Sequence, residues 1–198
     1  MHLLYGNIND YKWLDYENFS NLLPLLDKIK LQKLVKIEDQ KLFLLSRYLL
    51  HQLFIEFYHK SYLDVKIYYN EFHKPLMCDG YFNISHSNFY SVVVISDKKI
   101  GVDIEKIRPV DKNIISYFCT ENEKKYIFSS NDIQRSFWNI FCLKEAYVKM
   151  LGSTLLDFQT IEFQISPWQI KCANQLNLVI SILDEVDGYV IAVIEENN

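Results

Sequence analysis

Hydrophobic and polar residues along this chain recur with two periods, one typical of strands and one typical of helices. Alternation with a period of two indicates a strand, whereas apolar residues spaced three and four apart indicate a helix. The predicted strands cover residues 3–7, 65–70, 81–85, 90–96, 100–106, 160–165, 178–183 and 188–195. The predicted helices lie near residues 19–35, 39–59, 114–117, 121–129 and 133–151. The order of these elements favours an α+β fold.

The two halves of the chain end in similar pairs of strands. Residues 82–85 read Phe-Asn-Ile-Ser and residues 163–166 read Phe-Gln-Ile-Ser, and each segment precedes a longer apolar strand. This similarity predicts a duplicated α+β unit. We therefore expect two similar subdomains, residues 1–99 and 100–198. Since no stretch rich in Pro, Gly or Ser separates them, we expect them to pack as one body.

The composition is that of a globular protein. The 198 residues are 49% hydrophobic and 15% aromatic, which is too apolar for a disordered chain. The richest apolar stretch, residues 42–58, is interrupted by charged and polar residues, so no segment provides the roughly 18 uncharged residues of a membrane span. The first residues lack the basic start and apolar core of a secretion signal. We expect a cytoplasmic protein without a membrane segment.

The net charge, the cysteines and the glycines argue against several classes of function. The formal net charge of −4 gives no basic face for nucleic acid, so we expect no nucleic-acid partner. The four cysteines form no C-x-x-C pair, which argues against structural zinc. The five glycines form neither a dinucleotide-binding nor a P-loop motif. A local run of lysines is either a solvated helix face or an anion site: Lys28, Lys30, Lys33, Lys36 and Lys41.

Two short acidic motifs about forty residues apart carry the candidate chemistry. The first is Gly-Val-Asp-Ile-Glu at 101–105, and the second, Lys-Glu-Ala-Tyr-Val-Lys, occupies 144–149. In a strand Asp103 and Glu105 share one face, while Val102 and Ile104 are expected to face the core. In a helix Glu145 and Lys149 lie one turn apart. If the helix crosses the strand, three carboxylates meet in an oxygen site suited to Mg²⁺.

A third polar segment offers donors for a phosphate. Residues 82–87 read Phe-Asn-Ile-Ser-His-Ser, where a strand is expected to run into a polar turn, and a Lys-Pro pair precedes them. Hydroxyls, backbone N–H groups and the imidazole of His86 are suitable phosphate donors. Each motif alone is compatible with an ordinary surface, such as a solvent-facing carboxylate pair or a surface salt bridge. Their occurrence in this order favours a site.

In this order the motifs resemble the 4′-phosphopantetheinyl transferases of the larger Sfp-like type. The resemblance implies a pseudo-dimer of two fused halves with the active site in the cleft between them. It also implies transfer of the phosphopantetheine arm of coenzyme A to a serine of an acyl or peptidyl carrier protein, releasing adenosine 3′,5′-bisphosphate. The N-terminal half would bind the nucleotide and 3′-phosphate, and the C-terminal half would hold the metal and the catalytic helix.

The resemblance also implies roles for individual residues. Asp103, Glu105 and Glu145 resemble the ligands of Mg²⁺, or of Mn²⁺, and Lys149 resembles the lysine that supports phosphate charge. Glu145 is in addition our candidate for taking the proton of the serine hydroxyl. The residues that resemble the coenzyme A ligands are Lys74, Ser85, His86 and Glu123. We expect a monomer.

Some positions depart from the family pattern. Phe141 stands where the family usually has Trp, Cys142 where it has Ser or Thr, and His73 where it has Gly. Aligning Glu38-Asp39 puts Leu42 at the position of an early family arginine, with Arg47 a turn later. Lys30 or Lys33 is expected to compensate in holding the 3′-phosphate of coenzyme A.

Two other functions remain open from the sequence. One is a catalytically silent module that binds coenzyme A or a carrier protein, which the intact set of acids and Lys149 argues against. The other is a Mg²⁺-dependent pyrophosphate hydrolase, which is disfavoured because no further His or Asp cluster could hold a second metal. The carrier protein and its pathway, in fatty-acid, polyketide or nonribosomal peptide synthesis, are not identified by the sequence.

Overall fold

The chain divides into two compact units, residues 1–97 and 98–198. A computed structural model describes residues 1–11, 19–20, 23–72, 74–153, 158–166, 169–173 and 177–197. Each unit has its own hydrophobic core, made of residues from that unit alone.

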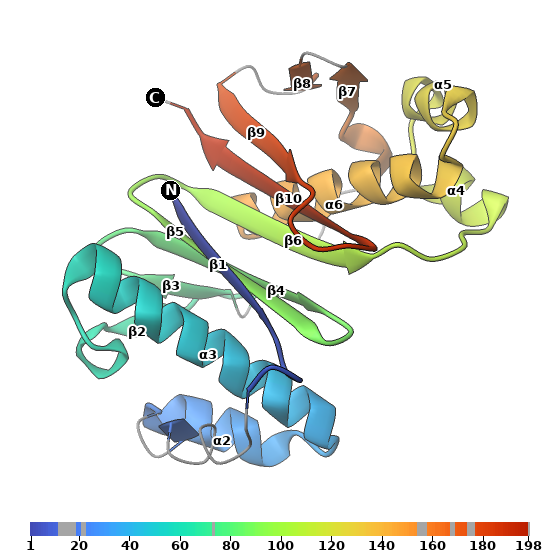
Figure 1. The fold of residues 1–198 in the computed structure, drawn as a ribbon. Coiled ribbons are helices and arrows are strands. Elements are labelled where there is room, and N and C mark those ends of the chain that lie inside the picture. The colour runs from blue at the N-terminus through green and yellow to red at the C-terminus, as the bar shows by residue number, and fades with distance from the viewer. Residues whose placement is uncertain are drawn as a thin grey trace. The chain divides into compact units, whose positions relative to one another are not determined.

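The N-terminal unit is a three-stranded antiparallel sheet packed against a long helix (Figure 1). Its elements are β1 (His2–Asn7), α2 (Leu25–Lys33), α3 (Ile37–Tyr58), η1 (Tyr62–Asp64), β2 (Ile67–Tyr69), β3 (Pro75–Met77), β4 (Tyr81–Ser87) and β5 (Tyr90–Ser96). The strand order is β1-β5-β4, and β2 and β3 form a separate two-stranded ribbon. Leu50 and Phe54 of α3 and Val93 of β5 belong to the core between helix and sheet.

The C-terminal unit has the same kind of architecture (Figure 1). Its elements are β6 (Ile100–Lys106), α4 (Lys112–Phe118), α5 (Glu121–Ser129), α6 (Ile133–Leu151), η2 (Phe158–Thr160), β7 (Phe163–Ser166), β8 (Gln169–Cys172), β9 (Leu178–Leu183) and β10 (Tyr189–Glu196). The sheet order is β6-β10-β9, α6 packs on the sheet, and β7 pairs with β8. Helix α6 begins after Asp132, whose side chain caps the amide of Arg135, and ends at Gly152 in the left-handed conformation.

The two units share one sheet topology. In each, the first strand pairs with the last strand, which pairs on its other side with the strand before it. All of these pairings are antiparallel, and the longest helix of each unit contacts the sheet. The predicted α+β class is therefore confirmed. The pseudo-dimer with an active site in its cleft, and the division of roles between the halves, stay predictions.

The structure extends the predicted elements in three places. Strand β4 runs to Ser87, so Ser85 and His86 lie in the strand and the turn follows at Asn88. The short strands β3 and β8 had no sequence prediction, because three or four residues give too little alternation to recognise. Within the described residues, no helix is long and apolar enough to cross a membrane.

Candidate functional site

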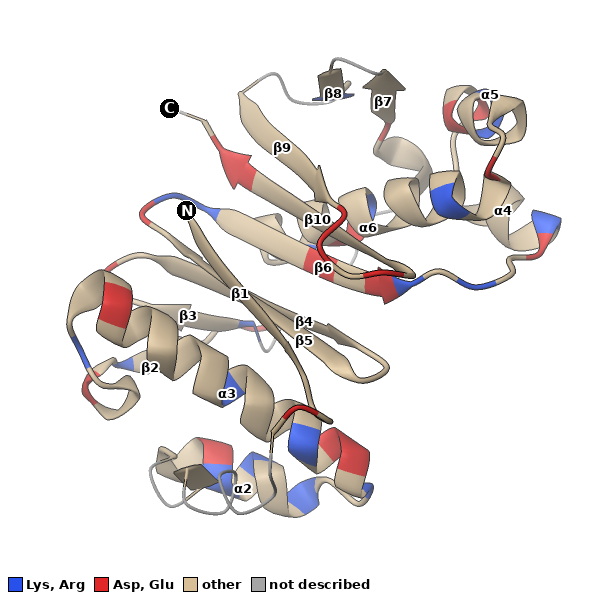
Figure 2. Cartoon of the chain, in the orientation of Figure 1, with Lys and Arg blue, Asp and Glu red and all other residues tan. Residues whose placement is uncertain are grey.

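The acidic face of β6 turns toward helix α6. Asp103 is paired directly with Ala192 of β10, and Ala192 belongs to the hydrophobic core with residues of α6. Because residues two apart in a strand share a face, Gly101 and Glu105 point the same way as Asp103. Val102 and Ile104 lie on the opposite face of β6, and both are fully buried, so the expectation that they are core residues is confirmed. Figure 2 shows the acidic part of β6 beside α6.

Gly101 allows the strand and the helix to approach this closely. A Cβ atom at residue 101 would lie 1.9 Å from the carbonyl oxygen of Ala146 and 2.5 Å from the backbone nitrogen of Met150. Both atoms belong to the backbone of α6, so no side chain could move aside. The glycine of the first acidic motif thus sets the distance between the two motifs.

The close approach brings acids and a lysine from both motifs together. Lys149 Nζ lies 2.6 Å from Asp103 Oδ1, and Asp103 is buried while Lys149 is partly exposed. Burial, together with the charges of Asp103 and Glu105, raises the pKa of Glu145 above its ordinary value, and Lys149 partly offsets this. Asp103, Glu105, Glu145 and Lys149 are called the acid–lysine cluster below.

The acid–lysine cluster has the donor set of a Mg²⁺ site. Within the described residues, no three His, Cys, Asp or Glu side chains converge as a ready-made metal cage. Mg²⁺ does not need one, because it commonly takes one or two carboxylates and completes its shell with water and substrate phosphate oxygens. The hard carboxylate oxygens of Asp103 and Glu145 therefore fit this metal, and a bound cation would offset the negative charges of Asp103 and Glu105 beside Glu145.

Glu123, predicted to bind the cofactor, lies in the interior instead. Its carboxylate accepts hydrogen bonds from the backbone amides of Thr120 and Phe163, and it lies 2.6 Å from Lys144 Nζ. Lys144 also donates to the carbonyls of Phe118 and Phe158. Neither charged side chain is more than 1% exposed. This arrangement is that of a structural ion pair, and a role for Glu123 in cofactor binding stays a prediction.

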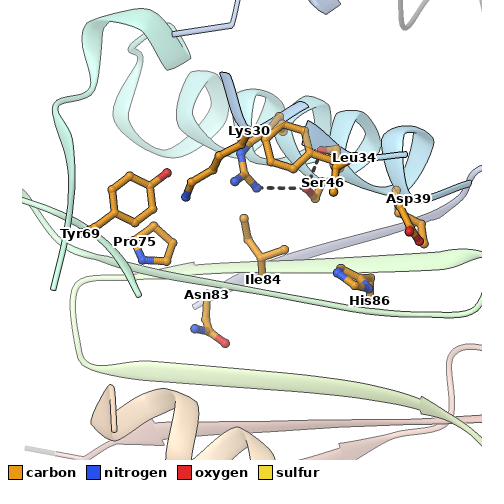
Figure 3. A pocket seen from close by; sticks show the side chains of 12 residues that line it. Lys30, Leu34, Asp39, Ser46, Tyr69, Pro75, Asn83, Ile84 and His86 are labelled. Carbon is orange, nitrogen blue, oxygen red and sulfur yellow. Dashed lines mark hydrogen bonds between the residues drawn. The ribbon is translucent and has the colours of Figure 1, made fainter. Parts of the chain in front are cut away.

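The N-terminal unit contains a pocket with a cavity volume of about 510 Å³. Residues of α2, α3 and β4 line it, together with Tyr69 and Pro75 (Figure 3). Its lining includes Lys30, Leu42, Arg47 and His86. Lys30 and His86 are two of the predicted coenzyme A ligands, so the structure brings them into one cavity. We call this cavity the α3 pocket.

Arg47 lines the α3 pocket, although the sequence reasoning noted its position without assigning it a role. It lies on α3, largely buried, five residues after Leu42. Its Nε donates to Asp27 Oδ2 at 2.9 Å, and its Nη1 donates to Ser46 Oγ at 3.1 Å. One signal was present in the sequence, because an arginine inside an apolar helical stretch is rarely buried unless it is paired. Its partner Asp27, directly before the lysine run, could not be identified from the sequence.

The other predicted ligands do not line the α3 pocket. Ser85 is buried and follows Ile84 in β4, so it points to the face opposite Ile84 and His86. Lys33 is exposed at the end of α2. Lys74 lines a smaller cavity of about 210 Å³ with Tyr68 and Tyr81. Roles for these residues in coenzyme A binding stay predictions, and His73 lies outside the described residues.

Comparison with known proteins identifies the family. Residues 99–194 match the family model of the 4′-phosphopantetheinyl transferase superfamily. This segment contains both acidic motifs, and it therefore contains the whole acid–lysine cluster.

Several characterised relatives match a larger part of the chain. It is 32% identical over 145 residues to the 4′-phosphopantetheinyl transferase gsp of Aneurinibacillus migulanus, covering 70% of this chain and 61% of that protein. It is 28% identical to ffp of Bacillus subtilis, covering 77% and 71%, and 25% identical to Sfp of Bacillus subtilis strain 168, covering 70% and 64%. The matches thus span 61 to 71% of the relatives' lengths. The resemblance seen in the motifs is confirmed, and the chain belongs to the 4′-phosphopantetheinyl transferase superfamily.

Proposed function

We propose that this protein transfers the 4′-phosphopantetheine arm of coenzyme A to a serine hydroxyl of an acyl or peptidyl carrier protein. Family membership supports this proposal, since the matched relatives are named 4′-phosphopantetheinyl transferases. The observation that carries it is the contact of 2.6 Å between Lys149 Nζ and Asp103 Oδ1. That contact joins the two acidic motifs into one charged cluster beside Glu145.

In the proposed reaction the serine oxygen attacks the phosphorus that carries the pantetheine arm. A new P–O bond to serine forms, the bond from that phosphorus to the bridging oxygen breaks, and adenosine 3′,5′-bisphosphate leaves. Phosphoryl transfer depends mainly on positioning and on neutralisation of charge. Lys149 supplies positive charge beside the reacting phosphate, and Glu145 accepts the proton of the serine hydroxyl.

A divalent cation belongs to the proposal as well. Asp103, Glu105 and Glu145 would hold Mg²⁺, or Mn²⁺ in its place. When bound, the metal supplies neutralisation of charge on the pyrophosphate of coenzyme A. Lys149 then shares that charge with the metal, and Asp103 orients Lys149 through their ion pair.

The α3 pocket is our candidate for the nucleotide end of coenzyme A. Lys30 and His86 line it and offer an ammonium and an imidazole to the 3′-phosphate. Arg47 retains N–H donors beyond those that bind Asp27 and Ser46, because a guanidinium carries five of them. We further propose that the protein acts as a monomer.

A mass measurement tests the proposed function. The protein is incubated with coenzyme A, Mg²⁺ and an apo carrier protein, and the carrier is then weighed. A gain equal to the phosphopantetheine arm is expected with the unaltered protein, and loss of that gain is expected in Asp103→Ala. Asp187→Asn is the matched control, because Asp187 is an exposed carboxylate of the same unit and Asn-Gly suits its turn equally well.

Other outcomes separate the alternatives. Cleavage of the pyrophosphate with no gain of mass on the carrier would identify a hydrolase. Binding of coenzyme A without any chemistry would identify a silent binding module. Full transfer by Asp103→Ala would show that the acid–lysine cluster is not the reacting centre.

A further inference from the structure

The positive charges that line the α3 pocket are matched by carboxylates. Among the described residues that line it, the fully charged side chains are Lys30, Arg47 and Asp39. A fourth charge, the buried Asp27, lies directly against Arg47. The formal charges of these two cations and two carboxylates therefore cancel, and these groups give the pocket no excess positive charge.

Asp27 is the stronger of the two neutralising groups. It is 2% exposed, and its carboxylate accepts from Arg47 Nε, from the hydroxyl of Tyr62, and from the hydroxyl of Tyr69 at 3.4 Å. Burial raises the pKa of Tyr62, so its hydroxyl stays protonated and donates. The network holds the guanidinium in place and cancels its charge where water does not screen it.

The other charged groups of the α3 pocket are also partly engaged. Lys30 Nζ lies 3.5 Å from the centre of the Tyr69 ring, a cation–π contact. Asp39 is exposed and lies near His86 at the opposite end of the pocket from Tyr69 (Figure 3). A phosphate near His86 would thus meet a carboxylate as well as an imidazole. Leu42, at the position of the family arginine, adds no charge.

We propose that the α3 pocket gains little from the 3′-phosphate, so that this protein uses 3′-dephospho-coenzyme A nearly as well as coenzyme A. This inference rests on the proposed function and names the substrate range of the same site. A charge-assisted hydrogen bond to a phosphate is worth roughly ten- to a hundredfold in affinity. Arg47 is already paired with Asp27, Lys30 lies against the Tyr69 ring, and the two carboxylates offset the two cations in formal charge, so repulsion from the carboxylates cancels most of that gain.

The test compares kcat/KM for coenzyme A and for 3′-dephospho-coenzyme A with the same apo carrier. For the unaltered protein we expect the ratio of the two values to stay below about tenfold. Asp39→Asn and Asp27→Asn each remove one carboxylate with little change of shape, and each should raise the preference for coenzyme A by about three- to tenfold. Glu38→Gln is the matched control, since Glu38 is the exposed acidic neighbour of Asp39 outside the pocket lining. Its ratio should equal that of the unaltered protein.

Two results would overturn the inference. One is a preference for coenzyme A above about a hundredfold in the unaltered protein. The other is a folded Asp39→Asn variant with the same ratio of kcat/KM values as the unaltered protein. This second test remains possible even if Asp27→Asn fails to fold. Failure of the proposed function looks different, because the carrier would then gain no mass from either substrate. In that case calorimetry with adenosine 3′,5′-bisphosphate and adenosine 5′-monophosphate still tests the pocket alone, and equal affinities are expected.

Discussion

Helix α6 carries two lysines that form ion pairs of equal length in very different surroundings. Lys144 lies 2.6 Å from Glu123, and Lys149 lies 2.6 Å from Asp103. The first pair is closed to solvent, and its lysine has two backbone carbonyls as further acceptors. The second pair is reached by solvent through Lys149, which is 30% exposed, and it lies beside Glu145 and Glu105.

The difference teaches how to separate a structural ion pair from a functional one. In the closed pair every strong donor of the lysine and both oxygens of the carboxylate are used, so no charge is left for a ligand. In the open pair carboxylates outnumber the lysine, and burial together with the charges of Asp103 and Glu105 raises the pKa of Glu145. An excess of negative charge in a partly exposed site does not favour stability, but it favours binding of a cation, and such sites are often functional.

Removing Lys144 is the change with the largest expected effect. Lys144→Met leaves the carboxylate of Glu123 buried without its cation, which should lower the free energy of unfolding by about 3–5 kcal/mol. Urea denaturation at neutral pH measures this. The double variant Lys144→Met/Glu123→Gln should recover much of the loss, because it removes both charges. A loss below about 1 kcal/mol in Lys144→Met would show that the closed pair is not structural.

Neutralising Asp103 should give the reverse pattern. Asp103→Asn relieves repulsion among the carboxylates while it loses the ion pair with Lys149, so the free energy of unfolding should change by less than about 1 kcal/mol. Transfer activity should nevertheless fall by about a hundredfold, or roughly 2.7 kcal/mol of transition-state stabilisation. Carrier modification and urea denaturation of the same sample provide the two readings. A variant that loses stability but keeps its activity would reverse our assignment of the two pairs.

Separating strand β6 from helix α6 should damage the open pair through its geometry. Gly101→Ala places a methyl group against the backbone of α6, which should cost about 1–3 kcal/mol of stability. Activity should fall as well, because displacing the helix by about 1 Å moves Glu145 and Lys149 away from Asp103. Thermal unfolding and carrier modification measure the two effects.

Gly188 provides the control for this substitution. It has φ of +73° and open space around it, so Gly188→Asn should be tolerated, since asparagine adopts the left-handed conformation more readily than most residues. If Gly101→Ala behaved like this control, contact with α6 would not explain why the motif begins with glycine.

The sequence predicted the open pair better than the closed one. Spacing alone placed Asp103 and Glu105 on one face of a strand and Glu145 one turn from Lys149, because these periods are local properties of the chain. Which face of the strand meets the helix is a property of packing: Val102 and Ile104 are buried as expected, but the face that carries Gly101 and Asp103 meets α6.

Long-range pairing accounts for the remaining gaps. Glu123 and Lys144 are 21 residues apart, and Arg47 and Asp27 are 20 apart. No local period links either pair, so their partnership depends on how helices pack. For the same reason the sequence did not predict the α3 pocket. Comparison with the family motif showed only that Leu42 stands in place of an arginine, and not that Arg47 lines the same pocket.

His51 in the N-terminal unit provides the smallest effect, and it extends the comparison to a half-buried, uncharged hydrogen-bond partner. Its Nδ1 accepts a hydrogen bond from the amide of Tyr62 at 3.1 Å, and burial lowers the pKa of the imidazole. The unfolded chain therefore takes up a proton as the pH falls through about 6.5, before the folded protein does. Stability is retained above that pH and declines below it. In His51→Asn, the urea midpoint should fall less between about pH 7.5 and about pH 5.5 than in the unaltered protein.

The exposed His59 serves as the control for this pH dependence. It has a left-handed φ of 53° that asparagine tolerates, so His59→Asn removes an imidazole without strain. This variant should keep the pH dependence of the unaltered protein. If His51→Asn kept it too, the decline would come from groups other than His51. The hydrogen bond between the Tyr62 amide and the uncharged His51 imidazole would then contribute nothing to the loss of stability in acid.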